Sequence, residues 1–183
     1  MLRTEMPHSG HVLEIASGTG EHAVYFTPRL HGLIWQPTDP DLVRCESIDA
    51  WRESEPCDRL LPAVQLDVCV EPWPLPSETK WSAIVCINMI HIAPWQACES
   101  LVAGAAKRLP TGAPLILYGP FFRRDIATAP SNLEFDESLR ARDPSWGIRH
   151  LDQVEQEAQR NGFELSRVVE MPANNLTVLF RKH

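Results

Sequence analysis

The sequence lacks the features that mark secreted, zinc-stabilised and membrane-spanning proteins. Its five cysteines include no C-x-x-C pair and are odd in number, so neither a disulfide framework nor a structural zinc site is expected. The first residues, Met1 to Pro7, have no apolar core of the kind that a signal peptide needs, and no apolar run approaches the length of a membrane helix. These absences predict a cytoplasmic protein that does not span a membrane.

Positive charge is also scarce. The 183 residues carry 17 Lys and Arg against 24 Asp and Glu, a formal net charge of -7. Because nonspecific nucleic-acid binding depends on neutralising phosphates with basic side chains, this balance argues against a nucleic-acid partner. No cluster of residues has metal-ligand spacing, so no metal is expected. With 44% hydrophobic residues, the chain has the composition of one ordinary globular domain spanning residues 1–183.

Short β-rich runs alternate with helix-length segments, and this order predicts a parallel sheet with crossover helices. Strands are expected at 11–15, 33–38, 63–67, 81–87 and 114–118, and helices at 21–30, 41–54, 94–109 and 151–160. The last two strands, 163–170 and 175–181, are joined by too few residues for a crossover helix and must be antiparallel neighbours. The predicted fold class is therefore α/β, a Rossmann-like, doubly wound, mostly parallel sheet with a C-terminal antiparallel hairpin.

A charged insertion at about 120–147 interrupts the alternation. Within it, Ser131 and Glu134 have the spacing of a capping box, which predicts a short helix that begins at Ser131 and ends before Pro144. We expect this insertion to lie on the substrate side of the domain.

The sharpest local signal is the segment 14–20, Glu-Ile-Ala-Ser-Gly-Thr-Gly, in which a strand runs into a glycine turn that opens a helix. Glycines let the chain turn tightly and let a ligand approach the backbone. The spacing Gly18-x-Gly20-x-x-Ala23 also matches a dinucleotide fingerprint. An NAD(P)-binding oxidoreductase is therefore a rival interpretation.

Acidic residues lie near the carboxyl ends of the first three predicted strands, at the edge where open α/β sheets bind ligands. They are Glu14, Asp39 and Asp67. Asp39 suits the hydroxyls of a ribose and Asp67 suits an adenine amino group, although an acid at a strand end can equally cap a turn. Neither Asp39 nor Gly18 is expected to belong to the core.

With four later motifs, this arrangement resembles the class I S-adenosylmethionine (SAM)-dependent methyltransferases. The motifs lie at 86–95 (Cys-Ile-Asn-Met-Ile-His-Ile-Ala-Pro-Trp), 129–132, 138–146 and 171–175. They are similar to those of a small methyltransferase-like family still classed as a domain of unknown function. The resemblance implies SAM as the cofactor and S-adenosylhomocysteine (SAH) as its product.

The resemblance also implies a set of cofactor-binding residues: Glu14, Ala16, Gly18, Gly20, His22, Asp39, Asp67 and Asn88. The acid of the first strand and the two glycines would hold the methionine and ribose end of the cofactor. Asp39 would bind the ribose hydroxyls, Asp67 the adenine, and Asn88 the floor of the pocket. Ala16 stands at the position of the superfamily's first glycine, which alanine is expected to fill only with a negative φ.

Methyl transfer from a sulfonium depends mainly on alignment, because the donor is already activated. A general base is needed only for a protonated acceptor, and His91 is the candidate. Candidates for the acceptor side are Tyr118, Arg123, Asn132 and Asn174. The acceptor is expected to be a small molecule, with a protein side chain as the second choice. A degenerate scaffold without activity is the other alternative to a methyltransferase.

Overall fold

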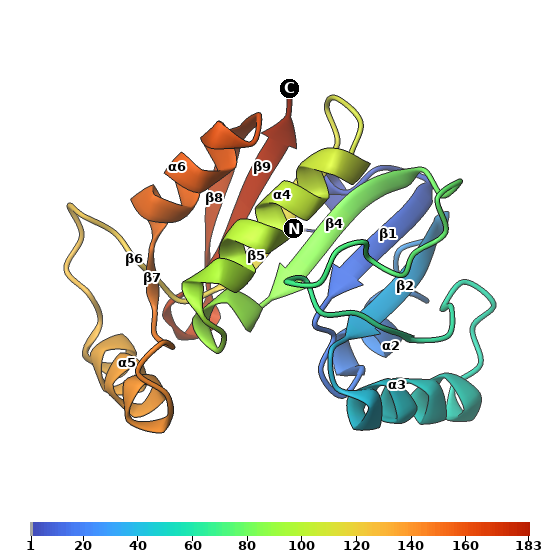
Figure 1. The fold of residues 1–183 in the computed structure, drawn as a ribbon, viewed down its shortest axis with the longest axis horizontal. Helices are drawn as coiled ribbons and strands as arrows, with labels where there is room; N and C mark the ends of the chain where they lie inside the picture. The colour runs from blue at the N-terminus through green and yellow to red at the C-terminus, as the bar shows by residue number, and fades with distance from the viewer. Residues whose placement is uncertain (1) are drawn as a thin grey trace.

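A seven-stranded sheet in the order β3-β2-β1-β4-β5-β9-β8 forms the centre of the protein (Figure 1). The structure is a computed structural model and describes residues 2–183. The first five strands run parallel, whereas β9 is antiparallel to both of its neighbours. The strands are β1 (Gly10–Ile15), β2 (Leu33–Asp39), β3 (Val64–Gln65), β4 (Trp81–Ile87), β5 (Pro114–Gly119), β8 (Phe163–Met171) and β9 (Asn175–Lys182). The predicted fold class is confirmed.

Helices lie on both faces of this sheet. In Figure 1, α4 (Trp95–Arg108) and α6 (Leu151–Arg160) cross the near face, and α2 (Glu21–Phe26) lies behind the strands. Helix α3 (Leu42–Ser54) contacts α2 and β2. The remaining short helices are α1 (Leu2–Glu5) and two 3-10 turns, η1 (Met89–His91) and η2 (Pro172–Asn174). Within residues 2–183, no helix combines the length and the apolarity that crossing a membrane requires.

The central strands carry one hydrophobic core on each face, because side chains alternate between the faces of a strand. Leu13 and Ile84 belong to the cluster that includes Leu101 of α4, whereas their neighbours Val12 and Val85 belong to the cluster on the other face. Strands buried on both faces read as nearly continuous apolar runs. This is why the strand at 81–87 was predicted with its observed bounds.

Two predicted boundaries differ from the structure for local reasons. The helix after the glycine turn ends at Phe26 and not at residue 30, because Pro28 has no N–H with which to continue the helical hydrogen bonds. The third strand is reduced to Val64–Gln65, since the Asp67 carboxylate accepts a hydrogen bond from the Cys69 N–H (2.8 Å) and turns the chain.

The insertion forms helix α5 (Pro130–Arg142) and the short strand β6 (Phe121–Phe122). Outside the main sheet, β6 pairs with β7 (Arg149–His150), which follows the insertion (Figure 1). The predicted capping box is wrong. The helix begins at Pro130, a residue favoured at the first helical position, and it has no side-chain cap. The Ser131 hydroxyl instead accepts a hydrogen bond from Asn174 Nδ2 (3.1 Å), so α5 is tied to the turn between β8 and β9.

Candidate functional site

A cleft of about 250 Å³ opens at the carboxyl ends of β1, β2 and β4. The glycine turn forms one wall, the start of α3 with Pro40 forms another, and the segment after β4 forms the floor. The predicted cofactor-binding residues that line the cleft are Ala16, Gly18, His22, Asp39 and Asn88. The sequence therefore predicts five residues that the fold brings together from three separate segments.

The glycine turn is built from residues with left-handed backbone conformations. Gly18 has φ +60° and Gly20 has φ +94°, values that glycine adopts without a Cβ penalty. A Cβ on Gly18 would have no atom within 4 Å, so the backbone here is open to a ligand, whereas a Cβ on Gly20 would lie 3.0 Å from Ile48. The expectation of a negative φ at Ala16 is wrong, because its φ is +54°. An alanine in this conformation is strained by about 1–2 kcal/mol.

Asp39 holds the glycine turn in place. Its carboxylate accepts hydrogen bonds from the Gly18 N–H (2.9 Å) and the Asp41 N–H (3.0 Å). Arg44 of α3 lies beside it, with Nη1 3.8 Å from Oδ2. Asp39 is completely buried, so the expectation that it lies outside the core is wrong. A carboxylate has about four acceptor positions, so these two hydrogen bonds leave Asp39 with further acceptor capacity.

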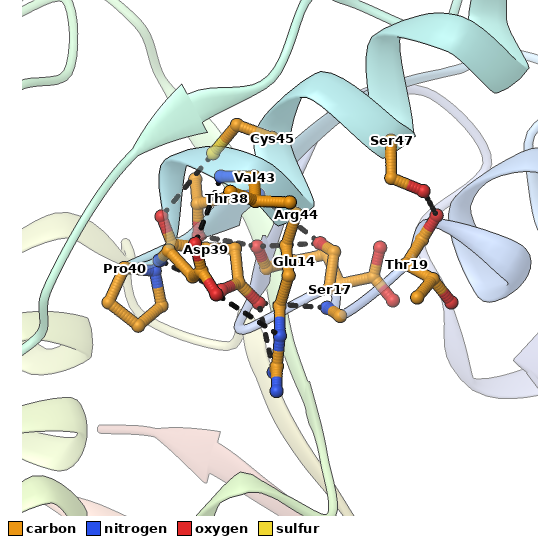
Figure 2. Close-up of polar contacts among 12 residues, drawn as sticks. Glu14, Ser17, Thr19, Thr38, Asp39, Pro40, Val43, Arg44, Cys45 and Ser47 are labelled. Atoms are coloured by element: carbon orange, nitrogen blue, oxygen red, sulfur yellow. Dashed lines mark hydrogen bonds and ion pairs between the residues drawn. The ribbon is translucent and has the colours of Figure 1, made fainter.

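Glu14 lies beneath the turn, buried, and is absent from the residues that line the cleft. Its Oε2 accepts a hydrogen bond from Trp35 Nε1 (2.9 Å), while its Oε1 has no partner among the described residues. Burial raises the pKa of this carboxyl to about 7, against the opposing effect of the hydrogen bond from Trp35. The structure therefore gives Glu14 a supporting place behind the turn, joined to β2 through Thr38 (Figure 2).

Asp67 is exposed and does not line the cleft. Its carboxylate accepts the hydrogen bond from Cys69 described above, which is the turn-capping alternative that the sequence left open. The role of Asp67 toward an adenine stays a prediction.

Asn88 and His22 both line the cleft. Asn88 has φ +62°, and its N–H donates to the carbonyl of Tyr118 on the neighbouring strand (2.8 Å). Its conformation presents this residue at the floor of the cleft. His22 is exposed and its ring stacks on Phe26. Although the residue is exposed as a whole, partial burial of its ring lowers the pKa of His22.

His91 is placed less favourably for catalysis than its position in the sequence suggested. The side chain is 1% exposed and is absent from the lining of the cleft. Its Nδ1 accepts a long hydrogen bond from the Arg149 N–H (3.4 Å), and its Nε2 has no partner among the described residues. Burial, reinforced by the charge of Arg149, lowers the pKa to about 3. The ring is thus a neutral, enclosed imidazole, and its role as a general base stays a prediction that the geometry does not favour.

The four candidate acceptor residues fall into two places. Arg123, Asn132 and Asn174 line a pocket of about 200 Å³ between α5 and the turn joining β8 to β9. Asn132 Nδ2 donates to the Asn174 carbonyl (3.1 Å), and Arg123 pairs with Glu170 (2.9 Å). Tyr118 lines a hollow against the sheet, which has Met171 in common with that pocket. Sequence reasoning did not find Arg44, although a basic residue five positions after Asp39 in a capped helix was available as a signal.

Among the residues 2–183 that the structure describes, no group of three or more His, Cys, Asp or Glu side chains is arranged to hold a metal ion.

The fold is shared with solved methyltransferase structures. One is CalO1, a methyltransferase in calicheamicin biosynthesis in its SAH-bound form (16% identity, TM-score 0.79, 100% of this chain and 52% of that chain). Another is an O-methyltransferase family 2 protein from Planctomyces limnophilus DSM 3776 in complex with apigenin (18%, 0.82, 100% and 56%). A third is magnesium protoporphyrin IX methyltransferase from Synechocystis PCC 6803 with bound SAH (12%, 0.70, 96% and 75%). This chain spans about half the length of the first two.

These likenesses, together with the sheet order and terminal hairpin, define the class I methyltransferase fold. The chain belongs to the family described as protein of unknown function (DUF938), whose match covers residues 1–182. The resemblance to the class I methyltransferases and the resemblance to a small family of unknown function, both inferred from the sequence, are therefore confirmed.

Proposed function

We propose that this protein binds SAM in the cleft beside the glycine turn and transfers its methyl group to a small-molecule acceptor. The observation that carries the proposal is the open backbone at Gly18, where a Cβ would meet no atom within 4 Å, directly in front of the buried Asp39 carboxylate. A ligand with a ribose fits this pair, because its hydroxyls are donors for a carboxylate. The occurrence of SAH in CalO1, which has the same fold, supports the choice of ligand.

The chain's residues would hold the cofactor in distinct ways. Gly18 leaves room for the ligand, Asp39 accepts from the ribose, and Ile87, Met89 and Ile92 supply apolar surface on the floor of the cleft. Glu14 and Thr38 support the turn from behind, which keeps Gly18 in position. Asp67 would reach the adenine only if that end of the ligand extends beyond the cleft.

SAM supplies a methyl group that is already activated by its positively charged sulfur. The contribution left to the chain is to align an acceptor with that methyl group and to exclude water. Since His91 is enclosed and neutral, an acceptor that is deprotonated at neutral pH, or that loses its proton to solvent, suits this site better than one that needs a base. The single catalytic domain spanning 1–183 and the cytoplasmic location belong to this proposal.

Activity can be tested with methyl-labelled SAM and a protein-free metabolite extract. The expected result is a labelled small molecule whose formation requires the protein. Gly18→Val should abolish labelling, because its side chain enters the ligand's space and a φ of +60° strains any β-branched residue. Arg124→Gln, which changes a side chain that is 77% exposed and lines none of these pockets, is the matched control and should label normally. SAH binding without any labelled product would favour the inactive scaffold.

A further inference from the structure

A hollow of about 570 Å³ lies beside the cleft, against β4, β5 and β9. Its floor is formed by the side chains of these strands that point away from α4, among them Val85, Ile116 and Thr177. Residues of α2 and of the turn that follows it form one wall. The hollow is larger than either the cleft or the pocket beneath α5.

The hollow joins the cleft. His22 and Ile87 line both spaces, so ligands in the two would be neighbours. The pocket beneath α5, which contains Asn132 and Asn174, has no lining residue in common with the cleft. Methyl transfer requires the acceptor atom to approach the methyl group directly. The hollow therefore meets a condition for acceptor binding that the pocket beneath α5 does not meet.

The lining of the hollow suits a flat apolar molecule. Phe26, Ile87, Ile116 and Met171 contribute apolar surface, and Tyr118 contributes an aromatic ring whose hydroxyl can hydrogen-bond a ligand. No aspartate or glutamate is among its lining residues. A hydrophobic ligand is thus favoured over a highly polar one.

One positive charge stands at the rim. The Arg29 guanidinium lies over the Tyr25 ring, 3.9 Å from its centroid, and donates to the Tyr25 carbonyl (2.9 Å). Within the described part of this acidic chain, Arg29 forms no ion pair with a carboxylate. His22, near the start of α2, has a lowered pKa because its ring is partly buried, so it contributes little positive charge. Arg29 therefore supplies the charge that would attract an anionic group to the hollow.

The hollow extends away from the cleft. His22 lines both spaces, whereas Arg29, three residues beyond the end of α2, lines the hollow and not the cleft. A volume of about 570 Å³ has room for a two-ring aromatic molecule with one carboxylate. Its anionic end would lie at Arg29 and its other end beside the cleft.

We propose that the hollow is the acceptor site and that the acceptor is an apolar aromatic molecule carrying one anionic group held by Arg29. The assignment of this molecule as acceptor rests on the proposed function, whereas its binding to the hollow can be measured independently.

The test uses the full chain with 2-naphthoate as the probe and 2-naphthamide as its neutral counterpart, titrated with and without saturating SAH. We expect 2-naphthoate to bind about tenfold more tightly than 2-naphthamide at low salt. Arg29→Gln should remove this preference, and Arg29→Lys should restore part of it. Arg124→Gln, the control, should keep the full preference, and SAH should not displace the probe.

Several results would overturn the proposal. They are an unchanged preference in Arg29→Gln, displacement of 2-naphthoate by SAH, or binding only after a dimer dissociates on dilution, which would make the hollow an interface between copies. A separate SAH titration distinguishes the two proposals. If SAH does not bind but Arg29-dependent binding of 2-naphthoate persists, the hollow is a ligand site and the proposed function has failed.

Discussion

Replacing Glu14 with glutamine should stabilise the protein at neutral and alkaline pH. The carboxyl is buried, and its pKa is raised from 4.5 to about 7. Between these two values the native state binds more protons than the unfolded chain, so the contribution of Glu14 to stability falls as pH rises through this window. The ionised form is disfavoured by about 3 kcal/mol above pH 8. Glutamine has no charge to bury and keeps an oxygen for the Trp35 Nε1–H.

The assay is urea unfolding of the wild-type protein and Glu14→Gln at several pH values. The free-energy difference in favour of the variant should grow from about 1 kcal/mol at pH 5 to about 3 kcal/mol at pH 8. Comparing the two proteins matters because His91, whose pKa is lowered, gives the wild type an opposite slope below pH 6.5. A pH-independent difference, or a variant that is less stable at pH 8, would refute the reasoning. SAH affinity should be unchanged, since Glu14 does not line the cleft.

Four further substitutions test the site and its surroundings. Ala16→Gly should stabilise the protein by about 1 kcal/mol in thermal unfolding, since glycine relieves the strain at φ +54°; a loss of stability would contradict that strain. Asp39→Ala should weaken SAH binding and cost about 1–3 kcal/mol of stability by leaving the N–H groups of the turn without an acceptor. Asp67→Ala is its exposed counterpart and should cost less than about 1 kcal/mol; equal losses would show that both acids are turn caps. Between pH 7 and pH 5, His91 takes up a proton in the unfolded chain but not in the native state, so the protein loses stability. His91→Phe should reduce this loss by about 2 kcal/mol. An unchanged loss would show that the pKa of His91 is not lowered in the native state.

Local patterns were enough to predict the sheet and most of the cleft. The apolar run at 81–87 predicts a buried strand, and the short link before β9 predicts that β8 and β9 are antiparallel. The glycines at 18 and 20 predict a tight turn. Asp39, the acid at the carboxyl end of β2, was predicted from its place at a strand end. Parallel strands bring their carboxyl ends to one edge, so Gly18, Asp39 and Asn88 meet there without any further information.

What the sequence could not predict depends on contacts between distant segments. The burial of His91 comes from Gly147 and Arg149, which lie beyond α5. The buried Asp39 carboxylate accepts hydrogen bonds from the N–H groups of Gly18 and Asp41. Such contacts leave no periodic pattern in the sequence from which they could be predicted. The left-handed conformation of Ala16 contradicts the preference of alanine, so only the surrounding fold imposes it.

Calorimetric titration of the full chain with SAH, with NADH as the comparison, tests the central claim most directly. The account predicts one SAH bound per chain, NADH binding that is absent or at least about tenfold weaker, and loss of the SAH signal in Gly18→Val. Binding of NADH without binding of SAH would favour the dinucleotide-dependent oxidoreductase over the methyltransferase. Binding of neither ligand by a folded chain would contradict the assignment of the cleft as a cofactor site.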